Sequence, residues 1–261
     1  MSRSGVRWIP VAIALALAGC QQQGVRSGPE GTTGQLGSPV ARQSPADIYI
    51  ELSAAYLQEK RFDEAFRNAQ KAVIVDPSSS NAYYMLALVQ QSLGQQSAAD
   101  QAFARSIALD SHNPNARNAY GSFLCSRGQM DEADAQFRQA LSNPLYATPW
   151  TSWHNAGACH ETAGDTQAAE RDYRAALQVN PRFAPSLLGM ARLSLANDNP
   201  LSARAYLQRY AEVAEHTAES LWLGVRTENQ LGDHDQMATY SLKLRAKFPD
   251  SDEAGYLKSI E

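Results

Sequence analysis

Side chains that bind metal ions or act as nucleophiles are scarce in this sequence. It contains three cysteines and five histidines among 261 residues, and none has the spacing of a zinc site. The segment HETAG at 160–164 lacks the second histidine that a metalloprotease helix places four residues after the first. Glycine-rich phosphate loops and nucleophile elbows are absent as well. We therefore expect no metal, no cofactor and no catalytic residue, and we expect His160 to be a buried, neutral packing side chain.

An excess of positive charge is also missing. The chain carries 23 basic and 27 acidic side chains, which gives a formal net charge of −4. Such a chain is a poor binder of nucleic acids. The apolar run at 8–18 is too short to span a bilayer stably. These absences leave other proteins as the expected partners, with no nucleic acid and no small-molecule substrate.

The first twenty residues have the pattern of a lipoprotein signal peptide. Arg3 and Arg7 precede the apolar run, which ends in the small residues of LAGC at 17–20. This lipobox predicts that Cys20 becomes the lipidated N-terminus; the alternative is an ordinary signal peptide that ends in a cysteine by chance. Gln21 stands where an aspartate would retain the protein in the inner membrane. We expect a lipid-anchored protein of the outer membrane that faces the periplasm.

Composition divides the chain into three parts. Residues 1–19 are the predicted signal peptide, and 20–45 form a tether that is rich in glycine, glutamine, serine and proline and lacks apolar periodicity. Residues 46–261 form the repeat domain. Removal of 1–19 leaves 242 residues with 21 basic and 27 acidic side chains, a formal charge of −6.

A pattern with a period of 34 residues starts at residue 46. It recurs from 80, 114, 150, 184 and 218, with a two-residue insertion before 150. The fifth unit lacks a turn glycine, and the sixth has Met237 where alanine is expected. In the first unit, the signature positions of a tetratricopeptide repeat are filled by Tyr49, Leu52, Ser53, Tyr56, Ala65, Ala69, Ala72 and Pro77.

Each unit is expected to fold as a hairpin of two helices. Small residues at positions 8, 20 and 27 let the helices approach closely, and an aromatic at position 24 fills the space beside them. Glycine at position 15 ends the first helix in a left-handed turn, and proline at 32 ends the second. One hairpin buries too little apolar surface alone, so six must stack. We predict an all-α, right-handed superhelix of about six hairpins, with a capping helix after Ser251.

Positions 2, 5, 9 and 12 of each first helix point into the groove of such a superhelix. The lysine, arginine and asparagine clamp that grips chaperone C-termini is absent at these positions. An apolar strip crosses repeats one and two instead, flanked by amides that can pair with a peptide backbone. We expect a helix or an extended segment of a partner to bind there, unless the tether covers the strip. The predicted partner-binding residues are Ile50, Leu57, Asn81, Tyr84, Leu88, Asn115 and Asn118.

Two further cysteines, Cys125 and Cys159, lie in the first helices of neighbouring repeats. A disulfide needs Cα atoms within about 7 Å. A bond between them is possible in a compartment that permits disulfides. Because the two positions point in different directions on their helices, we favour free thiols.

Several stretches outside the repeat signature make the chain resemble a known family. They are NAYGSFLC at 118–125, NPLY at 143–146, NAG at 155–157, FAP at 183–185 and ESLWLGVR at 219–226. With the lipobox, the tether and the six repeats, they resemble the type IV pilus biogenesis and stability lipoproteins of the PilF/PilW family. The resemblance covers essentially the whole chain.

The resemblance implies a pilotin. Such an outer-membrane lipoprotein binds the type IV pilus secretin and promotes its localisation and multimerisation in the outer membrane, and hence pilus biogenesis. Only lipidated Cys20 carries over residue by residue. The alternatives are a lipoprotein scaffold for periplasmic cell-wall hydrolases or outer-membrane protein assembly, and, more remotely, an enzyme with an unrecognised site.

Overall fold

The computed structural model describes residues 44–257, which form thirteen helices and no strand. The predicted signal peptide and most of the tether lie outside the described residues. The helices are α1 (Pro45–Gln58), α2 (Phe62–Val75), α3 (Ser80–Ser92), α4 (Gln96–Leu109), α5 (Pro114–Ser126), α6 (Met130–Leu141), α7 (Pro149–Thr162), α8 (Thr166–Val179), α9 (Ala184–Ala196), α10 (Pro200–Ala211), α11 (Ala218–Leu231), α12 (His234–Lys247) and α13 (Asp252–Tyr256).

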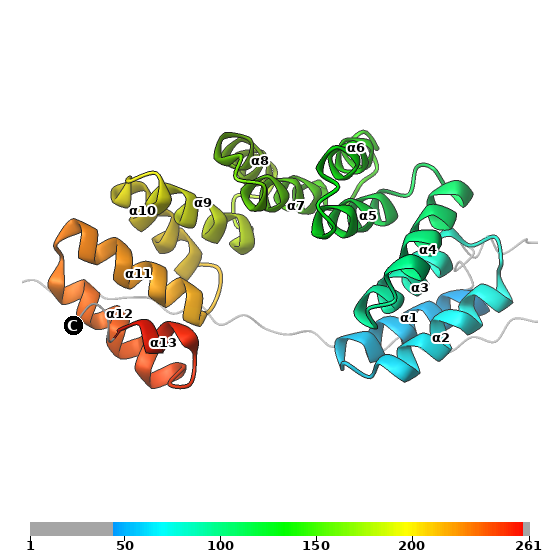
Figure 1. The fold of residues 1–261 in the computed structure, drawn as a ribbon, viewed down its shortest axis with the longest axis horizontal. Coiled ribbons are helices and arrows are strands. Elements are labelled where there is room, and N and C mark those ends of the chain that lie inside the picture. The colour runs from blue at the N-terminus through cyan, green and yellow to red at the C-terminus, as the bar shows by residue number, and fades with distance from the viewer. Residues whose placement is uncertain (1–43, 258–261) are drawn as a thin grey trace, which may run out of the picture. The chain divides into compact units, whose positions relative to one another are not determined.

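Each odd-numbered helix from α1 to α11 packs against the even-numbered helix that follows it, which gives six hairpins in the described domain. The hairpins stack into an arch with the odd-numbered helices on its inner side (Figure 1). The predicted all-α superhelix is therefore confirmed. The capping helix α13 begins after Ser251, whose side chain accepts a hydrogen bond from the amide of Ala254.

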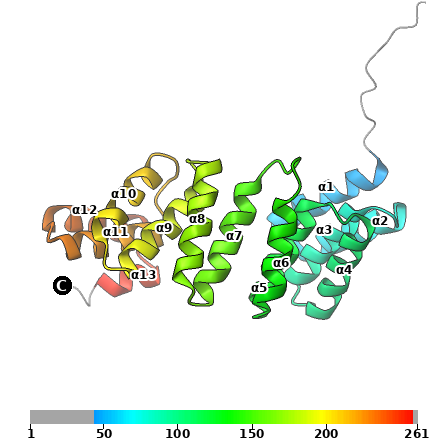
Figure 2. The same cartoon turned by 90° about the horizontal axis from the view of Figure 1, so that it is seen from above.

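The two edges of this stack have different connections. Figure 2 shows α5 to α8 side by side, with the α6–α7 connection at one end and the α5–α6 and α7–α8 turns at the other. We call the first the inter-repeat edge; it comprises the ends of the even-numbered helices, the starts of the odd-numbered helices and the residues between them. The opposite side is the turn edge. Because every hairpin is antiparallel, α1 also begins at the inter-repeat edge.

The turn within each hairpin needs a left-handed residue at position 15. Glycine supplies it in four repeats, with φ between 71° and 82° at Gly94, Gly128, Gly164 and Gly232. Lys60 (φ 58°) and Asp198 (φ 54°) adopt the same conformation at this position of repeats one and five. The hairpin geometry thus imposes the turn even where the sequence offers no glycine.

Aromatic rings from the even-numbered helices fill space beside glycines of the odd-numbered helices. A Cβ atom added to Gly121 would lie 2.7 Å from the ring of Phe137. The ring of Tyr173 lies against both Gly157 and Gly189, where added Cβ atoms would approach it to 2.8 and 2.7 Å. Larger side chains at these glycines would therefore force the helices apart.

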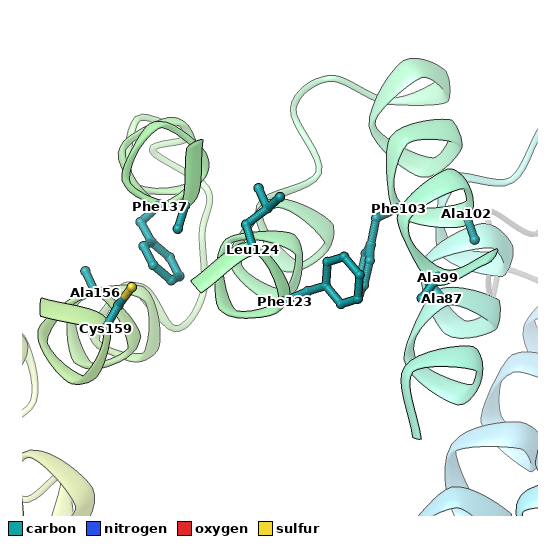
Figure 3. Packing of buried hydrophobic residues seen from close by; sticks show 10 residues of the cluster. Ala87, Ala99, Ala102, Phe103, Phe123, Leu124, Phe137, Ala156 and Cys159 are labelled. Atoms are coloured by element: carbon teal, nitrogen blue, oxygen red, sulfur yellow. The ribbon is translucent and has the colours of Figure 1, made fainter. Parts of the chain in front are cut away.

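Apolar contacts between repeats join the hairpins into a continuous core. Phe103 of α4 and Phe123 of α5 lie with ring centroids 5.4 Å apart (Figure 3). Phe137 and Cys159 extend the same cluster between α6 and α7. Positions 3 and 10 of repeats two to six are buried throughout. They are Ala82, Val89, Ala116, Phe123, Ser152, Cys159, Ser186, Leu193, Ser220 and Thr227.

The corresponding face of α1 has no preceding repeat to cover it in the part of the chain that the structure describes. Ile48 at position 3 is 47% exposed, and Leu52 at position 7 is 41% exposed. Ala55 at position 10 is exposed too. The first repeat therefore presents an apolar end face of the kind that interior repeats bury.

Candidate protein-binding groove

The seven predicted partner-binding residues all lie on three inner helices of the arch (Figure 1). Helix α1 carries Ile50 and Leu57, and α3 carries Asn81, Tyr84 and Leu88. Helix α5 carries Asn115 and Asn118. Whether a partner binds these residues stays a prediction.

The apolar members of this set are half-buried. Ile50 and Leu57 pack against the cluster of Ala65, Ala69, Met85 and Val89 between α1, α2 and α3. Leu88 contacts both this cluster and the next one, and Tyr84 packs against the second. Burial raises the pKa of Tyr84, because its ionised form would be poorly solvated. These side chains therefore offer part of their surface to a partner and support the core with the rest.

Two of the three amides already accept hydrogen bonds from other asparagine side chains. Asn113 donates a hydrogen bond from Nδ2 to Oδ1 of Asn81 at 2.8 Å. Asn155 donates in the same way to Asn118 at 3.0 Å. Asn115 is exposed and makes no such bond among the described residues. A partner backbone that bonds to Asn81 or Asn118 must therefore share or replace these contacts.

The expectation of free thiols is wrong. Cys125 of α5 and Cys159 of α7 form a disulfide, with their Cα atoms 5.8 Å apart. The two side chains point in different directions relative to their own helices. However, α5 and α7 stack side by side, so the concave-face position of one meets the inter-repeat position of the next. The direction of a side chain on its own helix does not indicate this contact, because the contact depends on how α5 and α7 pack.

A charged network occupies the inner face of the later repeats. Arg192 of α9 donates from Nε to Glu161 Oε1 at 2.6 Å and also bonds to Glu219. The hydroxyl of Tyr173 donates to Glu161 Oε2 at 2.7 Å. Burial alone would raise the pKa of Glu161, but the bonds from Arg192 and Tyr173 outweigh it and hold that pKa below its usual value.

This network escaped the sequence reasoning, although its signal was available. Glu161, Arg192 and Glu219 occupy positions 12, 9 and 2 of repeats four, five and six, which are groove positions. Reading these positions beyond repeat three finds all three residues. The inner face is thus apolar at its N-terminal end and charged towards its C-terminal end.

The two histidines of α7 have structural roles. Burial lowers the pKa of His154 to about 4, and its ring contacts those of Tyr173 and Phe183, with centroid distances of 5.4 Å to each. His160 is not buried as we expected. It is 23% exposed, and its two ring nitrogens lie 3.2 Å from Asp134 and 2.7 Å from Asp172. The difference arises because position 11 of this repeat faces carboxylates on α6 and α8.

The described range, residues 44–257, contains neither a candidate metal site nor a candidate membrane-spanning helix. No group of three histidine, cysteine, aspartate or glutamate side chains there is placed to hold a metal ion. No helix in this range is both long and apolar enough to cross a bilayer.

Known proteins resemble the chain over nearly its full length. The type IV pilus assembly protein PilF of Pseudomonas aeruginosa is 30% identical over 239 residues, which cover 92% of each chain. The chain belongs to the PilF/PilW family. A solved structure of Pseudomonas aeruginosa PilF superposes on this family member with a TM-score of 0.73, at 29% identity, and covers 83% of this chain and 97% of PilF.

The structure of PilW, described as a widely conserved type IV pilus biogenesis factor, gives a second match. Its TM-score is 0.73 at 27% identity, with 81% of this PilF/PilW family member and 97% of PilW covered. The tetratricopeptide repeat family matches residues 80–113 and 151–183, which correspond to the second and fourth repeats. The resemblance to the PilF/PilW family that the sequence showed is therefore confirmed.

Proposed function

We propose that this PilF/PilW family member takes part in type IV pilus biogenesis as a pilotin, an outer-membrane lipoprotein that binds the pilus secretin and promotes its localisation and multimerisation. The observation that carries the proposal is the likeness to PilF over 92% of both chains. The groove adds a physical reason, since half-buried apolar side chains flanked by amides suit a helix or an extended peptide. In this proposal the chain binds proteins and catalyses no reaction.

Lipidation at Cys20 supplies the transport step of the mechanism. A bacterial lipoprotein carries three acyl chains, and at about 0.8 kcal/mol per buried methylene such an anchor is permanent in practice. A secretin segment held in the groove is then carried along the lipoprotein sorting route to the outer membrane. Because one chain carries the lipid anchor and also holds the secretin segment, the secretin reaches the membrane together with the anchor and does not have to find it by diffusion.

The proposal is tested by a pull-down from detergent-solubilised envelopes with the mature protein. Tyr84→Ala combined with Leu88→Glu removes the centre of the apolar strip. If these side chains are hot spots, secretin recovery should fall as expected for a loss of about 2 kcal/mol, roughly thirtyfold in affinity. Leu242→Glu is the control, because Leu242 is 70% exposed on α12, outside the predicted strip.

Because Tyr84 and Leu88 also support the core, a second variant keeps the test valid if the first unfolds. Asn81→Asp with Asn115→Asp changes two exposed groove residues without removing apolar packing. Helical circular dichroism checks each variant. Recovery of cell-wall hydrolases or outer-membrane assembly proteins, with no secretin, would contradict the pilotin proposal and favour a general scaffold.

A further inference from the structure

We propose that the inter-repeat edge is a membrane-docking surface, which lies against the phospholipid bilayer that holds the lipid anchor. The proposal rests on the lipidation of Cys20 proposed above, and it adds an orientation of the whole repeat domain. Three independent features of the described residues point to the same edge: exposed apolar side chains, the distribution of charge, and the place where the chain enters the domain.

Exposed apolar side chains gather on this edge. Eight large hydrophobic residues in the described range are exposed by 46% or more, among them Ile48 in α1, Leu242 in α12 and Tyr256 in α13. Four lie at the inter-repeat edge: Ile74 (75%), Val75 (46%), Leu145 (88%) and Val179 (49%). Only Leu201 (66%), at the start of α10, lies at the turn edge. Single exposed apolar residues are ordinary on a protein surface, whereas their concentration on one edge marks a contact region.

The most exposed of these residues is held in a fixed position. Leu145 lies in the α6–α7 connection, the segment that contains the insertion. Its neighbour Tyr146 is 7% exposed, and its hydroxyl lies 2.8 Å from that of Thr151. Asn143 donates to the carbonyl of His112 at 2.7 Å, which ties the connection to the preceding repeat. Leu145 therefore points outward from an ordered segment, so contact with lipid costs little further conformational entropy.

Charge separates the two edges as well. The even-numbered helices begin at the turn edge and carry acids there, as the helix dipole favours. These acids are Asp63, Glu64, Asp131, Glu132, Asp165, Asp233 and Asp235. The bases in the turns at this edge are Lys60, Arg61 and Arg127. The inter-repeat edge mixes both signs: its bases include Arg138, Arg182, Arg209, Arg245 and Lys247, and its acids are Asp47, Asp76, Asp110, Glu212, Glu215, Glu219, Asp250, Asp252 and Glu253. An anionic lipid surface therefore meets more basic side chains at the inter-repeat edge than at the turn edge.

The chain enters the domain at the same edge. Helix α1 begins at Pro45, and 24 positions separate Cys20 from Ser44. A weak contact between the edge and the bilayer is sufficient to dock a tethered domain. The tether makes surface binding an intramolecular step at high effective concentration. Docked in this way, the domain would hold its concave face beside the membrane, with the groove axis running along the bilayer surface.

Tryptophan quenching by brominated phospholipids tests this orientation. Trp150 is half-exposed in the first turn of α7, at the inter-repeat edge. Trp153→Phe and Trp222→Phe leave it as the only tryptophan of residues 20–261. The lipidated protein with these changes is reconstituted into phosphatidylethanolamine and phosphatidylglycerol vesicles, with and without brominated acyl chains. We expect brominated lipid to reduce Trp150 emission, because interfacial contact places the side chain near the acyl boundary.

Two further variants locate the contact. Leu145→Glu with Val179→Glu should abolish the quenching. Leu201→Glu, an equally polar change of a comparably exposed leucine at the turn edge, should leave it unchanged. Vesicle flotation is measured on every sample, so that loss of the anchor is seen separately from loss of the edge contact.

Each other outcome overturns the proposal. Protein that floats without quenching is anchored but not docked, which leaves the pilotin proposal intact. Protein that does not float lacks the anchor, and then the lipidation and the docking fall together. If the Leu145 and Val179 changes leave quenching in place but remove secretin from the pull-down, this edge is a protein contact and not a lipid contact.

Discussion

At the scale of single residues, Lys60 is the clearest source of strain. Its φ of 58° lies in the left-handed region, where the conformation of a non-glycine residue costs roughly 1–2 kcal/mol of folding free energy. Lys60→Gly should therefore stabilise the domain by about 1 kcal/mol, measured by urea unfolding. Asp198→Gly should give a smaller gain, because aspartate tolerates this conformation better. Gly94→Ala makes the reverse change at position 15 of the second repeat and should destabilise the domain. A gain in stability for Gly94→Ala would contradict the explanation.

His154 predicts how stability depends on pH. Its pKa falls from 6.5 to about 4 on folding, so the folded state favours the neutral ring. The unfolded chain binds the proton first as the pH falls, so this contribution is complete above pH 6.5 and is lost between about pH 6.5 and pH 4. The loss should be on the order of 2 kcal/mol, below the full shift because the ring is partly exposed.

Thermal unfolding from pH 8 to pH 4 checks this expectation. His154→Gln should show a shallower fall in melting temperature than the wild type over the same range. Parallel curves for the two proteins would mean that other groups, and not His154, set the pH dependence.

Residue types predicted the turns within the hairpins better than they predicted the exposure and contacts of the groove side chains. Glycine at position 15 indicated four left-handed turns correctly, because this conformation depends on local backbone sterics. The half-burial of Tyr84 and Leu88 depends on neighbours in other repeats. Asn118 was predicted to be an amide of the groove that can pair with a peptide backbone. It already accepts a hydrogen bond from Asn155, a residue 37 positions away in the sequence. Contacts of this range carry no short-period signal.

At the scale of the helices, the Cys125–Cys159 disulfide joins two neighbouring hairpins. It closes a loop with a sequence separation of 34. Chain entropy for such a loop predicts about 3–4 kcal/mol of stabilisation, an upper value that measured disulfides often do not reach. Cys125→Ser with Cys159→Ser should therefore lower the urea midpoint clearly. Dithiothreitol should lower that of the wild type to the same level and leave the variant unchanged.

The sequence predicted the helices well, since the 34-residue period contains both the helical faces and their ends. It did not predict which helices touch across repeats. Cys125 and Cys159 meet because α5 and α7 stack side by side, a relation set by superhelix geometry and not by either helix alone. The Arg192 network joins three repeats in the same manner.

At the scale of the whole molecule, the pilotin proposal gives the anchor and the groove separable roles. A Cys20→Ser protein that is still secreted should keep its fold and its secretin binding in solution, because the repeat domain starts 25 residues later. It should nevertheless fail to bring secretin to the outer membrane. Fractionation of envelopes for secretin multimers measures this. Normal assembly with the serine variant would show that the lipid is dispensable.

The apolar end face of α1 makes the array open to enlargement. Ile48, Leu52 and Ala55 present the kind of surface that every later repeat uses to receive its predecessor. A further hairpin built from the second repeat and inserted before Pro45 would pack against this exposed face of α1, and the existing repeats would need no redesign. Repeat number is then an adjustable property of this scaffold, and gene duplication or protein engineering can lengthen its reach one hairpin at a time.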